Sequence, residues 1–125
     1  MKLHAIRENH LYSKAYARGK KYVAKNVVVY VLPDYAAKKL AKANPLKEKI
    51  NRVGITVTKK LGGAVVRNRA KRIIREGYRL ADKKNPIKRG FLIVIVARGS
   101  IVKARSFEIE NELTAAFGKL SMNQQ

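Results

Sequence analysis

The sequence predicts a small α+β protein in which helices pack against one β-sheet. Its 125 residues suit a single domain with one buried core. Its 46% hydrophobic content is normal for a globular protein and too high for a disordered basic tail. Strand-sized apolar runs also alternate with amphipathic helical segments along the chain. We therefore expect residues 1–125 to form one domain, a two-layer α-β sandwich with the element order α-β-β-β-α-β-α.

The first helix and the first strands are predicted before residue 33. Residues 8–18 indicate a short helix that ends at Gly19, because glycine is favoured at helix C-caps. The segment near Tyr22 leaves room for a short strand. Residues 26–32 are rich in β-branched side chains and end at Pro33, which predicts a strand.

A long basic connection follows at residues 33–51. Its Ala/Lys run at 36–43 favours helix and is broken by Asn44-Pro45. Residues 52–58 then alternate between apolar and polar side chains, which predicts a strand with one polar face.

The second half of the chain predicts two helices and a central strand. Residues 59–63 form the turn into a helix that runs from 64 to about 83. Residues 91–97 are a continuous apolar run, typical of a fully buried strand. Ser106 is expected to be the N-cap of a last amphipathic helix that includes Leu113, Phe117 and Leu120.

The helix at 64–83 carries the most informative surface. Its apolar residues share one side, while five cations fall between Arg67 and Arg75 on a segment whose only acid up to residue 81 is Glu76. A charged helix face is usually only a solvated face. Here the like charges repel one another unless a polyanion neutralises them, and arginine binds phosphate in a bidentate way. The helix therefore predicts a nucleic-acid-binding surface.

The net charge of +21 agrees with a nucleic acid partner. A membrane surface is the other polyanion, but no apolar run approaches the roughly 20 residues that span a bilayer, and no segment is typical of an interfacial helix. We therefore expect no membrane partner. The chain has no cysteine, so a reducing cytoplasm is the expected location.

Catalytic chemistry is not predicted for the chain alone. Its two histidines, His4 and His10, lie near the N-terminus without a partner pattern, and no phosphate-binding loop or dinucleotide motif is present. We expect no catalytic residue, no metal site, no cofactor of its own and no small-molecule substrate.

The segment 52–75 closely resembles the hallmark region of the bacterial ribonuclease P protein subunit, and weaker similarity spans about 7–120. The resemblance lies in a strand (Arg52-Val53-Gly54-Ile55-Thr56-Val57-Thr58), a turn (Lys59-Lys60-Leu61-Gly62-Gly63) and a helix that carries the triplet Arg67-Asn68-Arg69. It implies an α-β sandwich with an unusual left-handed βαβ crossover. It also implies a subunit that joins a catalytic RNA and assists removal of the 5′ leader from precursor tRNA, with the RNA holding Mg²⁺ and performing the hydrolysis.

The resemblance also implies two sets of site residues. The residues expected to bind the catalytic RNA are Lys59, Lys60, Arg67, Asn68, Arg69, Lys71, Arg72 and Arg75. The residues expected to bind the precursor tRNA leader are Tyr12, Tyr16, Tyr30, Arg52, Thr56 and Arg98. Tyrosine rings stack on unpaired bases without demanding a sequence. The residues alone leave this role and a partly buried core role for the tyrosines evenly balanced.

Two features depart from the family pattern. The 33–51 connection is longer than the usual hairpin loop, and its lysines either contact phosphates or only solvate the surface; these are Lys38, Lys39, Lys42, Lys47 and Lys49. Gly99 stands where some members carry a second cation, which leaves Arg98 as the candidate there. The alternatives to the ribonuclease P function are a ribosomal-protein-like structural RNA-binding protein and, more distantly, a protein-only nuclease.

Overall fold

A computed structural model describes residues 3–35 and 50–124 of the chain. The predicted helix-favouring run at 36–43 and the lysines of the 33–51 connection lie outside the described residues. The elements are β1 (His4–Ala5), α1 (Asn9–Arg18), β2 (Lys20–Val23), β3 (Val27–Pro33), β4 (Arg52–Thr56), the 3₁₀ turn η1 (Lys59–Leu61), α3 (Ala64–Lys84), β5 (Phe91–Ala97), the 3₁₀ turn η2 (Gly99–Lys103) and α4 (Ser106–Lys119). The predicted α+β class is confirmed, and so is the short strand near Tyr22.

The strands form one five-stranded sheet in the order β1-β4-β5-β3-β2. β5 lies in the centre, as its continuous apolar run predicts, with β4 parallel on one side and β3 antiparallel on the other. β1 was not predicted as a strand, because its two residues carry no periodic signal. It pairs parallel to β4, where His4 and Ala5 lie opposite Arg52 and Val53.

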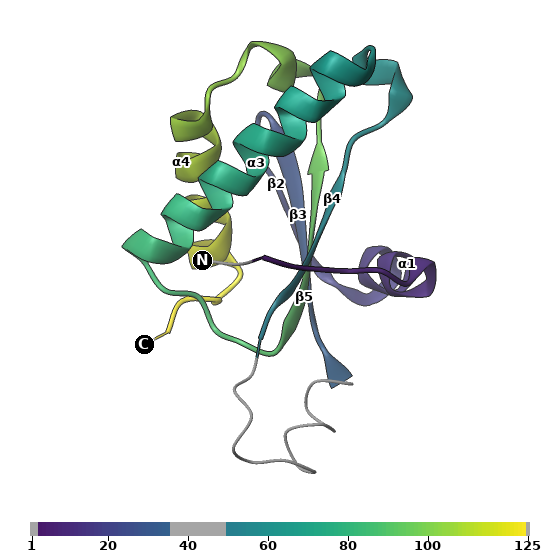
Figure 1. Ribbon diagram of the computed structural model, residues 1–125. Coiled ribbons are helices and arrows are strands. Elements are labelled where there is room, and N and C mark those ends of the chain that lie inside the picture. Colours follow the sequence, from purple (N-terminus) through teal and green to yellow (C-terminus); the bar gives the residue numbers. More distant parts are fainter. Residues whose placement is uncertain (1–2, 36–49, 125) are drawn as a thin grey trace.

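The crossover between β4 and β5 is left-handed. The two strands are parallel neighbours in the sheet, and α3 connects them. In Figure 1 both strands run upward, β4 lies nearer to the viewer than β5, and α3 crosses on the left of the sheet. About 98% of such connections are right-handed, so this hand is a distinctive feature of the fold.

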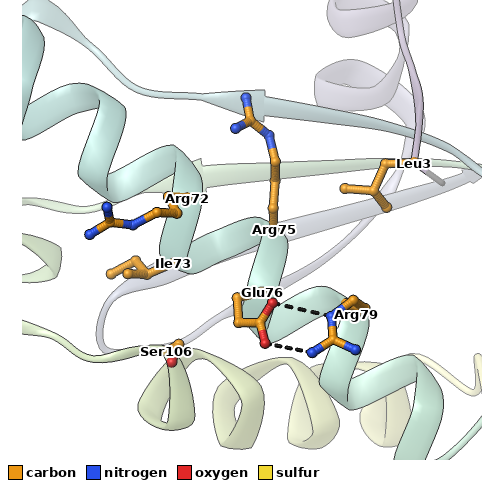
Figure 2. Close-up of a pocket in the computed structure, with 7 residues that line it drawn as sticks. All are labelled: Leu3, Arg72, Ile73, Arg75, Glu76, Arg79 and Ser106. Carbon is orange, nitrogen blue, oxygen red and sulfur yellow. Dashed lines mark hydrogen bonds and ion pairs between the residues drawn. The ribbon is translucent and has the colours of Figure 1, made fainter. Parts of the chain in front are cut away.

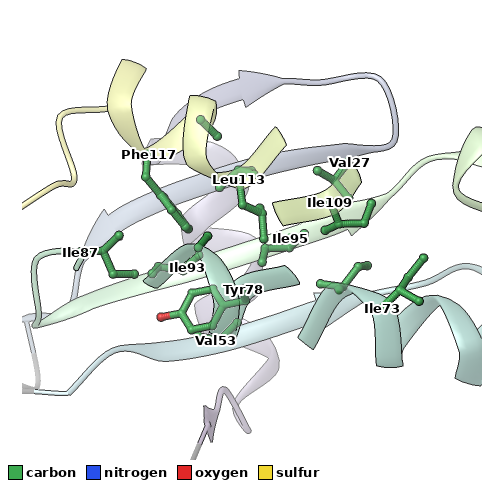
Figure 3. Close-up of a cluster of buried hydrophobic side chains, with 14 of the residues drawn as sticks. Val27, Val53, Ile73, Tyr78, Ile87, Ile93, Ile95, Ile109, Leu113 and Phe117 are labelled. Carbon is green, nitrogen blue, oxygen red and sulfur yellow. The ribbon is translucent and has the colours of Figure 1, made fainter. Parts of the chain in front are cut away.

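Helices cover both faces of the sheet, with α3 and α4 together on one face and α1 on the other (Figure 1). The pleat of β5 divides its side chains between them: Ile93 and Ile95 belong to the larger core under α3 and α4, and Leu92 and Val94 belong to the smaller core under α1. Figure 3 shows the larger core, in which the ring of Tyr78 meets that of Phe117 edge to face, with centroids 6.1 Å apart.

Gly77 allows α3 and α4 to pack closely. A Cβ at this position would lie 2.8 Å from Cγ2 of Ile109 and 3.0 Å from the backbone nitrogen of Glu110. The helix therefore needs glycine at this contact. Because α4 fixes the buried side of α3 in this way, the opposite side of α3 is held in a defined orientation.

Buried polar contacts fix the connection from α3 to β5. The carboxylate of Asp82, which is 5% exposed, accepts hydrogen bonds from Nη1 and Nη2 of Arg89 at 3.0 and 2.9 Å and from the backbone N–H of Ile87 at 3.1 Å. Tyr78 lies close by, and burial raises the pKa of its phenol to about 12. A buried carboxylate with three donors is satisfied, so this corner is structural.

One helix terminus differs from its prediction. Ser106 is the first residue of α4 and not its N-cap, which falls on Arg105 without a side-chain capping bond. Gly19 is the C-cap of α1, as predicted. Among the described residues, no helix is both long and apolar enough to cross a bilayer.

Candidate nucleic-acid interface

The turn before α3 sets the start of the basic helix. Gly62 has a φ of 148°, which side chains other than glycine rarely adopt, and a Cβ there would also crowd Val66 at 3.1 Å. Lys59 and Lys60 lie in η1 just before this glycine and are exposed. The turn therefore brings two further cations to the N-terminal end of α3.

The predicted division of α3 into an apolar and a cationic side is present. Ala70, Ile73 and Ile74 are buried, whereas Arg72 and Arg75 are exposed. Neither of these two guanidinium groups has a hydrogen-bond partner within the described part of the chain. We call the outer side of α3 with its preceding turn the arginine face; its predicted members are Lys59, Lys60, Arg67, Asn68, Lys71, Arg72 and Arg75.

Arg69 differs from the other cations of α3 because its guanidinium is engaged within the protein. Its Nη1 and Nη2 donate hydrogen bonds to the carbonyl oxygens of Val102 at 3.2 Å and Ala104 at 2.6 Å. It thereby holds η2 and the segment before α4 against the start of α3. Arg67 is half-buried, and its Nε is the one buried side-chain polar atom of the described residues without a partner.

The predicted leader-binding tyrosines gather on the other face of the sheet. Tyr12 from α1 and Tyr30 from β3 pack against the smaller core, and Tyr16, also from α1, contacts Tyr30. The rings of Tyr16 and Tyr30 meet edge to face, with centroids 5.0 Å apart and planes at 75°. The hydroxyl groups of Tyr16 and Thr56 are hydrogen-bonded at 3.1 Å. We call this group of Tyr12, Tyr16, Tyr30 and Thr56 the tyrosine face.

The tyrosines differ in exposure. Tyr16 is 42% exposed, so its ring is accessible from solvent. Tyr12 and Tyr30 are half-buried, and burial is the main cause that raises the pKa of the Tyr12 phenol. The two alternative roles therefore fall on different residues. Tyr12 and Tyr30 are partly buried against the sheet, and Tyr16 presents its ring to solvent.

Gly54 positions Tyr12. The alternation of apolar and polar residues in β4 predicts only that Gly54 lies in a strand. A Cβ on Gly54 would lie 2.5 Å from Cε1 and 2.6 Å from the hydroxyl oxygen of Tyr12. The tyrosine ring therefore lies directly on the backbone of β4. This contact brings α1 close to the sheet.

Replacing Gly54 by alanine is expected to displace the Tyr12 ring and lower the free energy of unfolding by about 1–3 kcal/mol, as overpacking does elsewhere. Denaturant unfolding monitored by circular dichroism measures the change. Gly99→Ala is the matched control, because a Cβ there meets nothing within 4 Å. A Gly54→Ala protein as stable as the Gly99→Ala protein would contradict the positioning role.

The two predicted arginines of the leader set are held by protein groups. Arg52 donates from Nε and Nη2 to the carboxylate of Asp34 at 2.7 and 3.0 Å, and from Nη1 to Glu8 at 3.3 Å. The hydrogen bonding of Arg52 to the Asp34 carboxylate is the main cause that raises the Arg52 pKa. Arg98 is exposed, and its Nη1 donates to the carbonyl of Ala24 at 2.7 Å. The charge of Arg52 is thus largely compensated, while that of Arg98 is not.

The arginine face and the tyrosine face therefore lie on opposite sides of one sheet. The arginine face lies on α3, and the tyrosine face lies between α1 and the sheet (Figure 1). Within the described residues, no three His, Cys, Asp or Glu side chains gather as a metal site. Fold and surface together define a class of small basic α+β proteins whose left-handed crossover helix carries exposed arginines.

Comparison with known proteins identifies the family within this class. The family model for Ribonuclease P matches residues 1–121. The ribonuclease P protein component of Clostridium acetobutylicum is 36% identical over 122 residues, which cover 98% of this chain and 92% of the relative. That of Clostridium botulinum is 39% identical over 113 residues, or 90% of each chain.

Solved structures of RNase P proteins also resemble the chain. The RNase P protein of Staphylococcus aureus has a TM-score of 0.74 at 27% identity and covers 98% of this chain and 100% of its own. The protein of Thermotoga maritima shares the fold, with a TM-score of 0.70 at 22% identity over 93% of this chain and 96% of its own. The chain therefore belongs to the ribonuclease P protein family. It is a protein subunit of a holoenzyme in which RNA performs the catalysis, and the predicted family and function are confirmed.

Proposed function

We propose that the arginine face binds the catalytic RNA of ribonuclease P while the tyrosine face binds the 5′ leader of precursor tRNA. The observation that carries the proposal is the position of the two faces on opposite sides of one sheet (Figure 1). A protein that contacts two RNA segments at once needs two such surfaces. Each face also has the chemistry that its segment would recognise.

The arginine face suits a structured RNA. Arg72 and Arg75 stand exposed on a helix whose other side is fixed to α4 and the sheet, so their Cα positions are rigid. Exposed guanidinium groups form bidentate bonds with phosphate oxygens. Contacts of this kind position a protein on RNA without reading its sequence. Arg69 contributes by holding η2 in place rather than by binding phosphate.

The tyrosine face suits an unpaired strand. The open ring of Tyr16 offers a stacking surface, and Tyr30 supports it from the sheet. Stacking on aromatic rings tolerates any base, which a leader of variable sequence requires. Arg98 supplies an exposed cation after the end of β5, the strand next to β3.

Magnesium ions belong to the RNA part of this proposal. Ribonuclease P is a metal-dependent ribonucleoprotein, and Mg²⁺ is generally bound through water and phosphate oxygens with few carboxylates. The described residues contain no group of three His, Cys, Asp or Glu side chains that could hold it. We place the holoenzyme in the cytoplasm, where precursor tRNA is available in bacteria.

Reconstitution tests the proposed function. The purified chain is combined with a bacterial ribonuclease P RNA, and cleavage of precursor tRNA is measured at low magnesium concentration. We expect strong stimulation over the RNA alone, because bound cations replace part of the magnesium that RNA folding requires. RNA binding without stimulation would favour the ribosomal-protein-like alternative, and cleavage without RNA would favour a protein-only nuclease.

A further inference from the structure

A pocket of about 620 Å³ lies beside α3, on the side where α4 begins. Arg72, Arg75 and Arg79 line it from α3, and Ser106 lines it from α4 (Figure 2). Arg79 and Ser106 belong to neither predicted RNA-binding set. The pocket thus extends the cationic surface by one helical turn toward the C-terminal end of α3.

Glu76 is the single acid among the described residues that line this pocket. Its carboxylate accepts two hydrogen bonds from Arg79, at 3.1 Å from Nε and 2.6 Å from Nη2. The hydrogen bond from Arg79 is also the main cause that lowers the Glu76 pKa. Figure 2 shows the pair at one end of the pocket, whereas the guanidinium groups of Arg72 and Arg75 point elsewhere. One arginine of three is therefore neutralised in the free protein.

We infer that this pocket is a phosphate site for the catalytic RNA, and that Glu76 stays hydrogen-bonded to the guanidinium of Arg79 until an RNA phosphate replaces it. The inference rests on the proposed function of the arginine face. A carboxylate and a phosphate present the same pair of oxygens to a guanidinium, so they compete for it.

The pair can open, because both side chains are accessible. Arg79 is 40% and Glu76 43% exposed, and exposed ion pairs of neighbouring turns are weak. A phosphate that enters the pocket also meets the hydroxyl of Ser106 at the positive end of the α4 dipole. Arg72 and Arg75 also line the pocket and add to its positive charge, although their guanidinium groups point away from Arg79 in the free protein.

Competition predicts that the effects of Glu76 and Arg79 on RNA binding depend on each other. Glu76→Gln is expected to raise affinity for ribonuclease P RNA about three- to tenfold, because it frees Arg79. Arg79→Gln alone should change affinity less than about twofold, because the phosphate contact that it removes is offset by the Glu76 ion pair that RNA binding no longer has to break. In the Glu76→Gln background, Arg79→Gln should lower the affinity for the catalytic RNA about three- to tenfold. The dissociation constants come from fluorescence titration with the catalytic RNA at several salt concentrations.

Glu110→Gln is the matched control for charge. It removes one acid from a half-buried position on α4, and the Glu110 side chain makes no hydrogen bond or ion pair within the described residues. Its effect should stay below that of Glu76→Gln and add to that of Arg79→Gln. Equal effects of Arg79→Gln in both backgrounds would overturn the inference while leaving the proposed function intact. The proposed function itself fails if the parent chain does not stimulate cleavage of precursor tRNA by the RNA, whatever the two variants do.

Discussion

Replacing both Arg72 and Arg75 by alanine is expected to weaken binding to the catalytic RNA about ten- to a hundredfold at physiological salt. Both guanidinium groups are exposed on α3 and have no partner within the described residues, so their removal costs the fold little. Each lost phosphate contact should also reduce the salt dependence. The slope of log affinity against log salt concentration is therefore expected to become shallower by about 1–2.

Lys25→Ala with Lys119→Ala is the control for the double arginine variant. It removes the same charge from two exposed positions, one in the turn before β3 and one at the end of α4. This control should reduce affinity no more than about threefold through the general field of the protein. Equal losses for the two double variants would mean that net charge, and not the arginine face, governs RNA binding.

Periodicity predicted the elements that carry the arginine face. The continuous apolar run at 91–97 identified the central strand β5, and the apolar positions of α3 identified its buried side. Both signals are local, because the spacing of apolar residues along the chain indicates whether a helix or strand is buried on one face or on two. The cationic side of α3 followed from the same spacing.

Long-range geometry could not be predicted from these patterns. The left-handed crossover depends on how α3 passes over the sheet, which periodicity does not encode. The resemblance implies RNA-binding roles for Arg69 and Arg52, but tertiary contacts engage them with the carbonyls beside η2 and with Asp34. Gly54 carried no signal of its Tyr12 contact, since the two residues lie 42 positions apart. Side-chain partners of this kind depend on the assembled fold.

Replacing Tyr16 by alanine is expected to weaken binding of precursor tRNA to the holoenzyme about 5- to 100-fold and to leave mature tRNA unaffected. The variant removes the exposed ring that rests against Tyr30 and therefore the stacking surface for a leader base. Mature tRNA has no leader and cannot use this surface. Dissociation constants of the reconstituted holoenzyme for both RNAs measure the difference.

Two controls separate stacking from other roles of Tyr16. Tyr16→Phe keeps the ring and loses only the hydrogen bond to Thr56, so it should bind precursor tRNA within about threefold of the parent. Phe107→Ala removes another exposed aromatic side chain, located on α4, and should change neither affinity. If Tyr16→Ala weakened the binding of both RNAs equally, Tyr16 would affect binding by stabilising α1 and not by stacking on a leader base. Equal losses for Tyr16→Phe and Tyr16→Ala would instead assign the effect to the hydroxyl group, because only the ring can stack.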